Sequence, residues 1–414
     1  MHHLDHWRDK LKHVSHPDHE QRPEPRVDPI SRLKTNDQPP PPGSSGPVAA
    51  ITQRAIDVFL LSKQENGEIG GIGYWQTANG YTAMALHDKW CNSTHNARML
   101  QDLLQKVERH HPNFVNEFND DTLWWGICLL ELSDLTCDPI YIQKAIIIWH
   151  HVSRSVISKG QHSVRGKDME GGVLWTTKPG EDSINTITTG QYAELSARLA
   201  MLCSMTDGVL DPTIQLPSTD DFVQAAERSV EWIIRCRYRE HDAIVLDTIH
   251  LKSGERVDWT FTYTTGQLIA ASAALFAATR SPSHLKLAIH LAERSMVRHG
   301  WVDSNGILTE AGAYGRENHQ AWQNDDAVGF KSVLIRSLAK LYAVLVEQNQ
   351  NQHREVTDTI GRFVRRNFRS LQEHNTNGNG QYGPWWAGPM DMPTSHAQLA
   401  VLDVMAAVGL VDRG

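Results

Sequence analysis

The sequence predicts an all-α protein in which six helical hairpins close into a double ring, an (α/α)6 barrel. From residue 47 onward, about twelve segments carry apolar residues at helical spacing. Strand-like runs are few and short, at 172–175 and 243–246, and both fall in connections. An open solenoid would show a repeat of fixed period, and the sequence contains none.

The predicted helices follow one another without a linker that would divide the chain. In 219–239, for example, Val223, Ala226, Val230 and Ile233 recur at steps of three and four residues, which is typical of a helix with one buried face. The predicted segments are 47–65, 75–90, 94–110, 120–134, 139–159, 184–205, 219–239, 261–280, 282–299, 325–346, 352–372 and 394–409.

Residues 1–46 differ from the rest of the chain. They are rich in His, Pro and charged residues and include four consecutive prolines at 39–42. Such a composition cannot supply a packed core. We therefore expect a disordered tail over 1–46 and one helical domain over 47–414.

Composition excludes several classes of protein. A net charge of -8 does not suit a nucleic-acid partner, which requires a basic face. The most apolar run, 268–278, is too short to span a membrane. The five cysteines lack metal-ligand spacing, so neither a metal site nor a cofactor is expected.

The first residues are charged and have no apolar core, so they do not form a secretory signal. On the sequence as given we expect a cytoplasmic monomer. A secreted or cell-wall location follows if the true N-terminus is missing.

The most informative stretch is 119–134. Asn119 occupies the position of an N-cap, Asp120 and Asp121 open the helix, and the pair Trp124-Trp125 follows. One interpretation is that the two carboxylates only complement the helix dipole. The other is catalytic, because cleavage of a glycosidic bond requires one carboxylic acid and one carboxylate.

Chemistry could use two adjacent aspartates only at a helix start. Inside a regular helix, neighbouring side chains diverge by about 100°. At the first turn, where the backbone is still irregular, both can face one cleft. Two close carboxyls also titrate separately, as a nucleophile and an acid/base require.

Every second connection between helices is rich in Trp, Tyr, Gly and Asp. The stretches are 67–76, 119–125, 168–175, 258–263, 322–326 and 382–389. The glycines of 67–76 resemble a phosphate loop only superficially, because no strand precedes them and no Gly-Lys-Ser/Thr follows. In a ring of hairpins, alternate connections emerge on one face. Flat rings beside carboxylates suit pyranose sugars, so a carbohydrate or small glycoside-like substrate is the expected partner.

These residues resemble glycoside hydrolase family 76, the endo-α-1,6-mannanases and related fungal cell-wall mannosidase/transglycosidase proteins. Trp75-Gln76 looks like the family's opening Trp-Gln/Asn motif, and Asp120-Asp121 with Trp124-Trp125 looks like its Asp-Asp-x-x-Trp-Trp motif. Further matches are Gly171 to Trp175, Asn185 in the next helix, and Asp326 with Phe330-Lys331.

The resemblance implies a retaining (α/α)6 enzyme with Asp120 as nucleophile and Asp121 as general acid/base. Together with the aromatic residues of the alternate connections, it suggests a substrate-binding set made of Trp75, Gln76, Trp124, Trp125, Trp175, Asn185, Trp259, Tyr263, Asp326 and Trp386. We expect Asp120, Asp121 and the tryptophans 75, 125, 175, 259 and 386 to share one cleft. A retaining pair should place the two carboxyl carbons about 5–6 Å apart.

The chain departs from the family pattern at two amide-bearing sites. Thr264-Thr265 stands where the family has Asn-Gln, and Ala327 stands where it has Gln. Three functions therefore remain open: a retaining glycosidase or transglycosidase acting on α-1,6-linked mannosides, a repurposed intracellular member that tailors a small metabolite, and a catalytically silent carbohydrate-binding protein.

Overall fold

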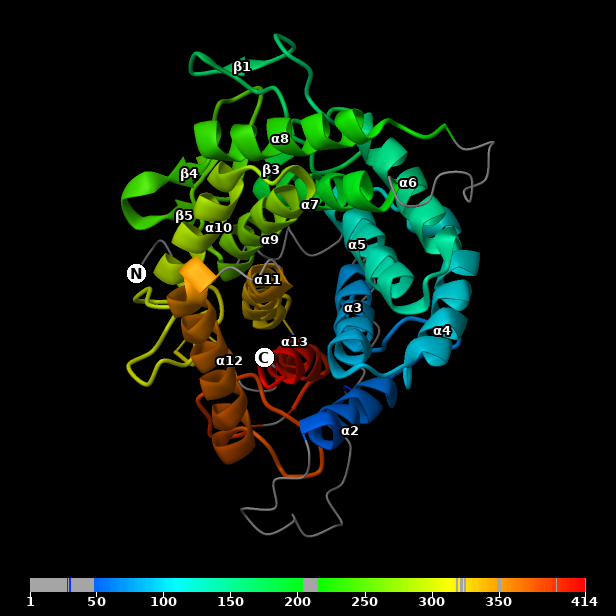
Figure 1. The fold of residues 1–414 in the computed structure, drawn as a ribbon, viewed down its shortest axis with the longest axis vertical. Helices are drawn as coiled ribbons and strands as arrows, with labels where there is room; N and C mark the ends of the chain where they lie inside the picture. The colour runs from blue at the N-terminus through cyan, green and yellow to red at the C-terminus, as the bar shows by residue number, and fades with distance from the viewer. Residues whose placement is uncertain are drawn as a thin grey trace.

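The computed structural model describes residues 28, 30, 48–203, 215–317, 319–320, 323, 325–347, 351–391 and 393–413. Within these ranges, twelve α-helices form two concentric layers (Figure 1). The inner helices are α3 (Tyr74–Cys91), α5 (Asn119–Thr136), α7 (Thr186–Cys203), α9 (Thr262–Thr279), α11 (Ala327–Glu347) and α13 (Ser395–Val411). The outer helices are α2 (Val48–Leu60), α4 (Ala97–His110), α6 (Pro139–Ser153), α8 (Thr219–Cys236), α10 (Pro282–Ser295) and α12 (Arg354–His374).

The inner ring is closed. Each inner helix packs against the next, and α13 returns to pack against α3. All twelve predicted segments correspond to helices, so the predicted double ring is confirmed. The two layers differ in burial. The outer helix α4 buries one stripe (Leu100, Leu103, Leu104, Val107), whereas the inner helix α13 is buried on every side. Among the described helices, none is long and apolar enough to cross a membrane.

Short antiparallel strands join the connections at one end of the barrel. β3 (Ser183–Asn185) pairs with β6 (Thr248–His250), which pairs with β7 (Arg256–Val257). The two-stranded pairs are β1 (Ser163–Val164) with β2 (Lys167–Asp168), and β4 (Tyr238–Arg239) with β5 (Ile244–Val245). The strand predicted at 243–246 is β5, whereas 172–175 makes only isolated bridges.

Ion pairs cross the buried interior of the inner ring. Arg336 on α11 donates two hydrogen bonds of 2.8 Å to Asp403 on α13, and Arg198 on α7 donates one of 2.6 Å to Glu131 on α5. These charges are buried but paired, which is the condition under which an interior accepts them.

The predicted tail lies outside the described residues except for Asp28 and Ile30. These two residues contact the barrel. The Ile30 side chain is fully buried, and its carbonyl oxygen accepts a hydrogen bond from Gln381. The Asp28 carboxylate accepts the backbone N–H of Ser395, the first residue of α13, and so satisfies a helix N-terminus.

Candidate active site

A cleft lies at the N-terminal ends of four inner helices. Trp75 is the second residue of α3, Asp120 the second of α5 and Tyr263 the second of α9, and Asp326 directly precedes α11. The cleft encloses about 60 Å³ and is lined by Trp75, Phe118, Asp120, Asp121, Trp124, Trp175, Tyr263, Asp326 and Phe330. Seven of the predicted site residues are therefore brought together. The partial positive charges of the helix starts favour carboxylates at this end of the barrel.

The Asp120 carboxylate is held from two directions. The indole Nε1–H of Trp175 lies 3.1 Å from each carboxylate oxygen, and the backbone N–H of Asp121 donates to Oδ1 at 3.0 Å. Gln191 donates to the backbone carbonyl of Asp120 at 3.2 Å. The carboxylate group is thus oriented by its neighbours while it lines the cleft.

Asp121 occupies a different environment from Asp120. It is 3% exposed, and its Oδ2 accepts a hydrogen bond of 2.8 Å from Asn116 Nδ2. Burial raises the pKa of Asp121 to about 7, against the opposing effect of the Asn116 hydrogen bond and with a smaller contribution from the negative charge of Asp326. A buried carboxyl of this kind holds a proton near neutral pH and can release it.

Aromatic rings form the walls of the cleft. Trp75 and Trp124 are stacked with their centroids 6.1 Å apart, and Tyr263 and Phe330 lie nearly parallel at 4.2 Å. Trp175 is braced by Phe118, 5.1 Å away. Such surfaces can pack against the C–H faces of sugar rings.

Asp326 supplies a third carboxylate. Its side chain is 42% exposed, and Gln76 Nε2 donates a hydrogen bond to its Oδ1. His396 Nε2 lies 4.0 Å from the same oxygen. Gln76 is not among the residues that line the cleft, and its hydrogen bond there orients Asp326. The prediction of Gln76 as a direct substrate ligand is therefore corrected to a supporting role.

Two predicted site tryptophans belong to the core. Trp125 is 0% exposed and packs among Tyr74, Tyr81 and Phe114. Trp386 is 1% exposed, and the amino group of Lys331 lies 5.0 Å from its ring centroid. Neither ring lines the cleft, so the prediction that both share it is wrong.

Two further predicted residues lie beside the cleft without lining it. The Asn185 amide oxygen accepts the backbone N–H of Ile187, and its Nδ2 donates to Thr248, so Asn185 holds the start of α7 against β6. Trp259 contacts Phe261 at 5.5 Å, and Phe261 packs on Phe330. Asn185 is thus corrected to a structural role, and Trp259 is connected to the cleft-lining Phe330 through Phe261.

Asn119 is the first residue of α5 and not its N-cap, which is Phe118. A Phe side chain has no acceptor for the helix N–H groups. Asn119 instead donates from Nδ2 to the carbonyl of Leu174 at 2.8 Å. This bond ties the start of α5 to the strand-like connection that carries Trp175.

The substituted family positions do not face the cleft. Thr264 Oγ1 donates to the carbonyl of Val245, and Thr265 Oγ1 accepts the N–H of the same residue, both at 3.0 Å. Ala327 is also buried. None of these three side chains lines the cleft.

Sequence reasoning missed Phe118, Phe330 and Asn116 as site residues. Phe330 could have been found, because it lies four residues after Asp326 and so one helical turn away on the same face. Phe118 directly precedes the helix that carries the Asp pair. Asn116 gives no signal in the sequence, since polar residues are common in connections.

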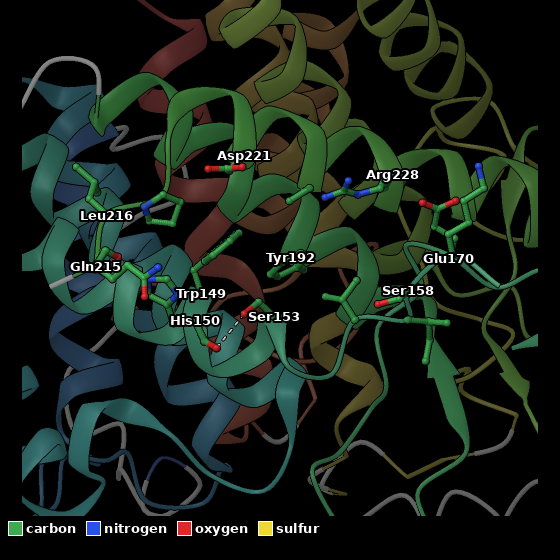
Figure 2. Close-up of a pocket in the computed structure, with 15 residues that line it drawn as sticks. Trp149, His150, Ser153, Ser158, Glu170, Tyr192, Gln215, Leu216, Asp221 and Arg228 are labelled. Atoms are coloured by element: carbon green, nitrogen blue, oxygen red, sulfur yellow. Dashed lines mark hydrogen bonds between the residues drawn. The ribbon is translucent and has the colours of Figure 1, made fainter. Parts of the chain in front are cut away.

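A larger cavity of about 560 Å³ lies among α6, α7 and α8 (Figure 2). Trp149, Tyr192 and Arg228 are among its lining residues, and none of the predicted site residues lines it. Two acidic residues, Glu170 and Asp221, line it, and Asp221 is engaged with Ser218 in the capping box of α8. We therefore assign the candidate active site to the smaller cleft.

Solved structures with the same fold include several carbohydrate enzymes. An inactive variant of an α-1,6-mannanase from Salegentibacter sp. HEL1_6, with two consecutive aspartates replaced by alanine and α-1,6-mannotetrose bound, superposes with a TM-score of 0.73 at 20% identity, covering 88% of this chain and 100% of that chain. Dfg5 from Chaetomium thermophilum, in complex with glucosamine, superposes with a TM-score of 0.69 at 16% identity, covering 88% and 90% of the two chains. Lin0763 from Listeria innocua superposes with a TM-score of 0.66 at 18% identity, covering 88% of this chain and 97% of that chain.

No curated protein sequence matches the chain. The sequence model of glycosyl hydrolase family 76, in contrast, matches residues 49–412, which include the whole ring from the second residue of α2 to α13. The match includes every residue that lines the cleft. The chain therefore belongs to glycosyl hydrolase family 76.

Proposed function

We propose that this protein is a retaining glycosidase or transglycosidase that acts on α-1,6-linked mannosides. The observation that carries the proposal is the pair Asp120 and Asp121, two consecutive carboxyls that line one aromatic cleft in different environments. Asp120 is oriented by Trp175 and a backbone N–H, whereas Asp121 is buried and holds a proton near neutral pH. This difference matches the two roles in a double displacement.

In the first step, a carboxylate oxygen of Asp120 attacks the anomeric carbon and forms a glycosyl ester. The glycosidic C–O bond breaks, and the leaving oxygen takes the proton of Asp121. The indole N–H of Trp175 keeps the Asp120 oxygens aligned while their negative charge is lost to the new bond. Orientation of this kind contributes to the rate because the geometry is fixed before reaction.

In the second step, the ionised Asp121 removes a proton from a water molecule or from a sugar hydroxyl. The resulting oxygen attacks the anomeric carbon, and the ester bond to Asp120 breaks. Asp121 is then protonated and Asp120 ionised, as at the start. Water as acceptor gives hydrolysis, and a sugar as acceptor gives chain transfer.

The substrate class is supported by the walls of the cleft and by the relatives. Stacked rings provide apolar platforms, and the half-exposed Asp326 provides an acceptor for hydroxyl groups. The enclosed volume of about 60 Å³ is smaller than the 300–1,000 Å³ typical of pockets that bury a whole ligand, which favours a substrate lying across an open cleft. The Salegentibacter enzyme is an α-1,6-mannanase whose variant lacking two consecutive aspartates is inactive.

The proposal is tested with α-1,6-mannooligosaccharides and an aryl mannoside that has a good leaving group. Wild-type protein should cleave or transfer the oligosaccharides. Asp120→Asn should lose activity toward both substrates, since an amide does not attack the anomeric carbon. Asp121→Asn should retain the first step on the aryl mannoside, which needs no proton donor.

Asp102→Asn is the matched control, because Asp102 is exposed on the outer helix α4. It should behave as wild type. If Asp120→Asn and Asp121→Asn lost activity equally toward both substrates, the separate roles would be contradicted. Inertness of the folded wild-type protein toward all α-1,6-mannooligosaccharides would favour a compact, non-polymeric substrate instead.

A further inference from the structure

One wall of the cleft is built by rings from two different helices. Tyr263 on α9 and Phe330 on α11 lie with their centroids 4.2 Å apart and an angle of 4° between their planes. Phe261 packs against both rings, at 5.6 and 5.0 Å. The position of this wall therefore depends on how the starts of α9 and α11 are held relative to each other.

The start of α9 has no local cap. Its N-cap residue is Phe261, whose side chain has no hydrogen-bond acceptor. The acceptor comes instead from Glu310, 48 residues further along the chain: the backbone N–H of Thr262 donates to Glu310 Oε1 at 3.0 Å. The Thr262 hydroxyl donates to Oε2 of the same carboxyl. Glu310 thus caps α9 across space, one residue before Tyr263.

Glu310 is itself fixed. It is 3% exposed, and its carbonyl accepts the backbone N–H groups of Ala313 and Tyr314, which makes a tight turn. It interacts electrostatically with Lys331, which is also buried and directly follows Phe330 on α11. The amino group of Lys331 donates to the carbonyl of Val328 at 2.8 Å. The two buried charges therefore flank the two helix starts that carry the aromatic wall.

Glu310 does not line the cleft, so it has no contact with a substrate there. We propose that Glu310 is a positioning residue: it holds the first turn of α9 and thereby fixes Tyr263 against Phe330 for sugar binding. The sugar-binding part of this inference rests on the proposed function, whereas the capping of α9 does not. Loss of the cap should weaken binding more than it slows the chemical step, since the Asp pair lies on α5.

The test compares Glu310→Leu with Glu310→Gln. Leu keeps the approximate volume and removes both acceptors, whereas Gln can satisfy the N–H and the hydroxyl of Thr262 again. For an α-1,6-mannooligosaccharide, Glu310→Leu should raise KM by about tenfold with a smaller change in kcat. Glu310→Gln should restore KM to near the wild-type value. Glu293→Leu, an exposed position on α10, is the matched control and should match wild type.

The near-ultraviolet circular dichroism of the aromatic wall provides a readout without substrate. Glu310→Leu should change this spectrum, and Glu310→Gln should not. If wild type neither cleaves nor binds mannooligosaccharides, the proposed function fails while the spectra still test the cap. A wild-type spectrum and KM for Glu310→Leu would overturn the inference, as would a selective loss of kcat.

Should Glu310→Leu fail to fold, Thr262→Val removes one of the two hydrogen bonds at nearly unchanged shape. It should shift the spectrum and KM in the same direction by a smaller amount. An unchanged spectrum and KM for Thr262→Val would overturn the proposal.

Discussion

Replacement of the buried carboxyl of Asp121 by an amide is expected to stabilise the folded protein at alkaline pH. Burial raises the pKa of this group from 3.8 to about 7 in the folded state. Between these values the folded protein binds a proton that the unfolded chain has released, so its stability falls as pH rises. The contribution of Asp121 to the free energy of unfolding is therefore fully present below about pH 4 and is lost as pH rises through about 7. The Asn side chain of Asp121→Asn does not titrate, so the variant does not lose this stability as pH rises.

The size of the effect follows from the same two pKa values. The interval between 3.8 and about 7 corresponds to about 4 kcal/mol at about 1.4 kcal/mol per pKa unit. This figure is an upper limit, because local opening lets an ionised carboxylate reach water. Between about pH 5 and about pH 8.5, the advantage of Asp121→Asn over wild type should grow by about 3 kcal/mol at most. Replacing a charged group in a buried active site by a neutral one commonly raises stability and lowers activity.

Denaturant unfolding at those two pH values measures the difference directly. Wild type, Asp121→Asn and the exposed control Asp102→Asn are compared at each pH. The control should track wild type. If Asp121→Asn has the same advantage at both pH values, or none, the carboxyl is ionised in the folded state throughout, and it cannot be the acid of the first step.

Three further outcomes are expected. Asn116→Ala removes the donor to Asp121, so the pKa of that carboxyl rises further and the alkaline limb of the pH–rate profile moves upward by about one unit; an unmoved limb would contradict the assignment. Trp175→Phe removes the N–H that contacts both oxygens of Asp120 and should slow the first step by about 10–100-fold, measured as the rate of aryl-group release. Trp125→Phe should lower the free energy of unfolding by about 1–3 kcal/mol and leave KM unchanged, because this ring lies in the core; an increased KM would show that it reaches the substrate.

The fold could be predicted because the apolar pattern is unambiguous. Amphipathic outer helices such as α4 and mostly apolar inner helices such as α13 give different but equally clear helical signals. The contacts of Asp28 and Ile30 could not be predicted, because these residues pack on the barrel from within a polar segment. Composition averages over a segment, so it misses a single apolar residue that meets a complementary surface.

The Asp pair and most of the cleft could also be predicted, since helix starts in a ring of hairpins converge on one face. Which member of a tandem tryptophan faces the cleft could not. Trp124 and Trp125 are consecutive on α5, so their side chains point in directions about 100° apart. Trp124 lines the cleft, whereas Trp125 does not line it and is completely buried. Trp386 was placed wrongly for a related reason, because aromatic residues in connections also fill the space between layers.

Long-range supports of the site leave no trace in the sequence. Glu310 and Thr262 are 48 residues apart, and neither has a neighbouring pattern that predicts their contact. Asn185 was predicted as a substrate ligand, although its amide is occupied by the start of α7 and by Thr248. A polar residue near a site can serve either the substrate or the backbone, and only the three-dimensional arrangement distinguishes the two.

In the proposed mechanism, Asp120 forms a covalent bond to the sugar. The most direct test is to incubate the protein with an activated fluorinated mannoside, which reacts in the first step and is slow in the second. The intact mass and the mass of each peptide are then measured. The double-displacement mechanism predicts one added sugar, located on Asp120, and no added sugar in Asp120→Asn. A sugar located on Asp121, or an unmodified protein that nevertheless turns over α-1,6-mannooligosaccharides with inversion at the anomeric carbon, would contradict it.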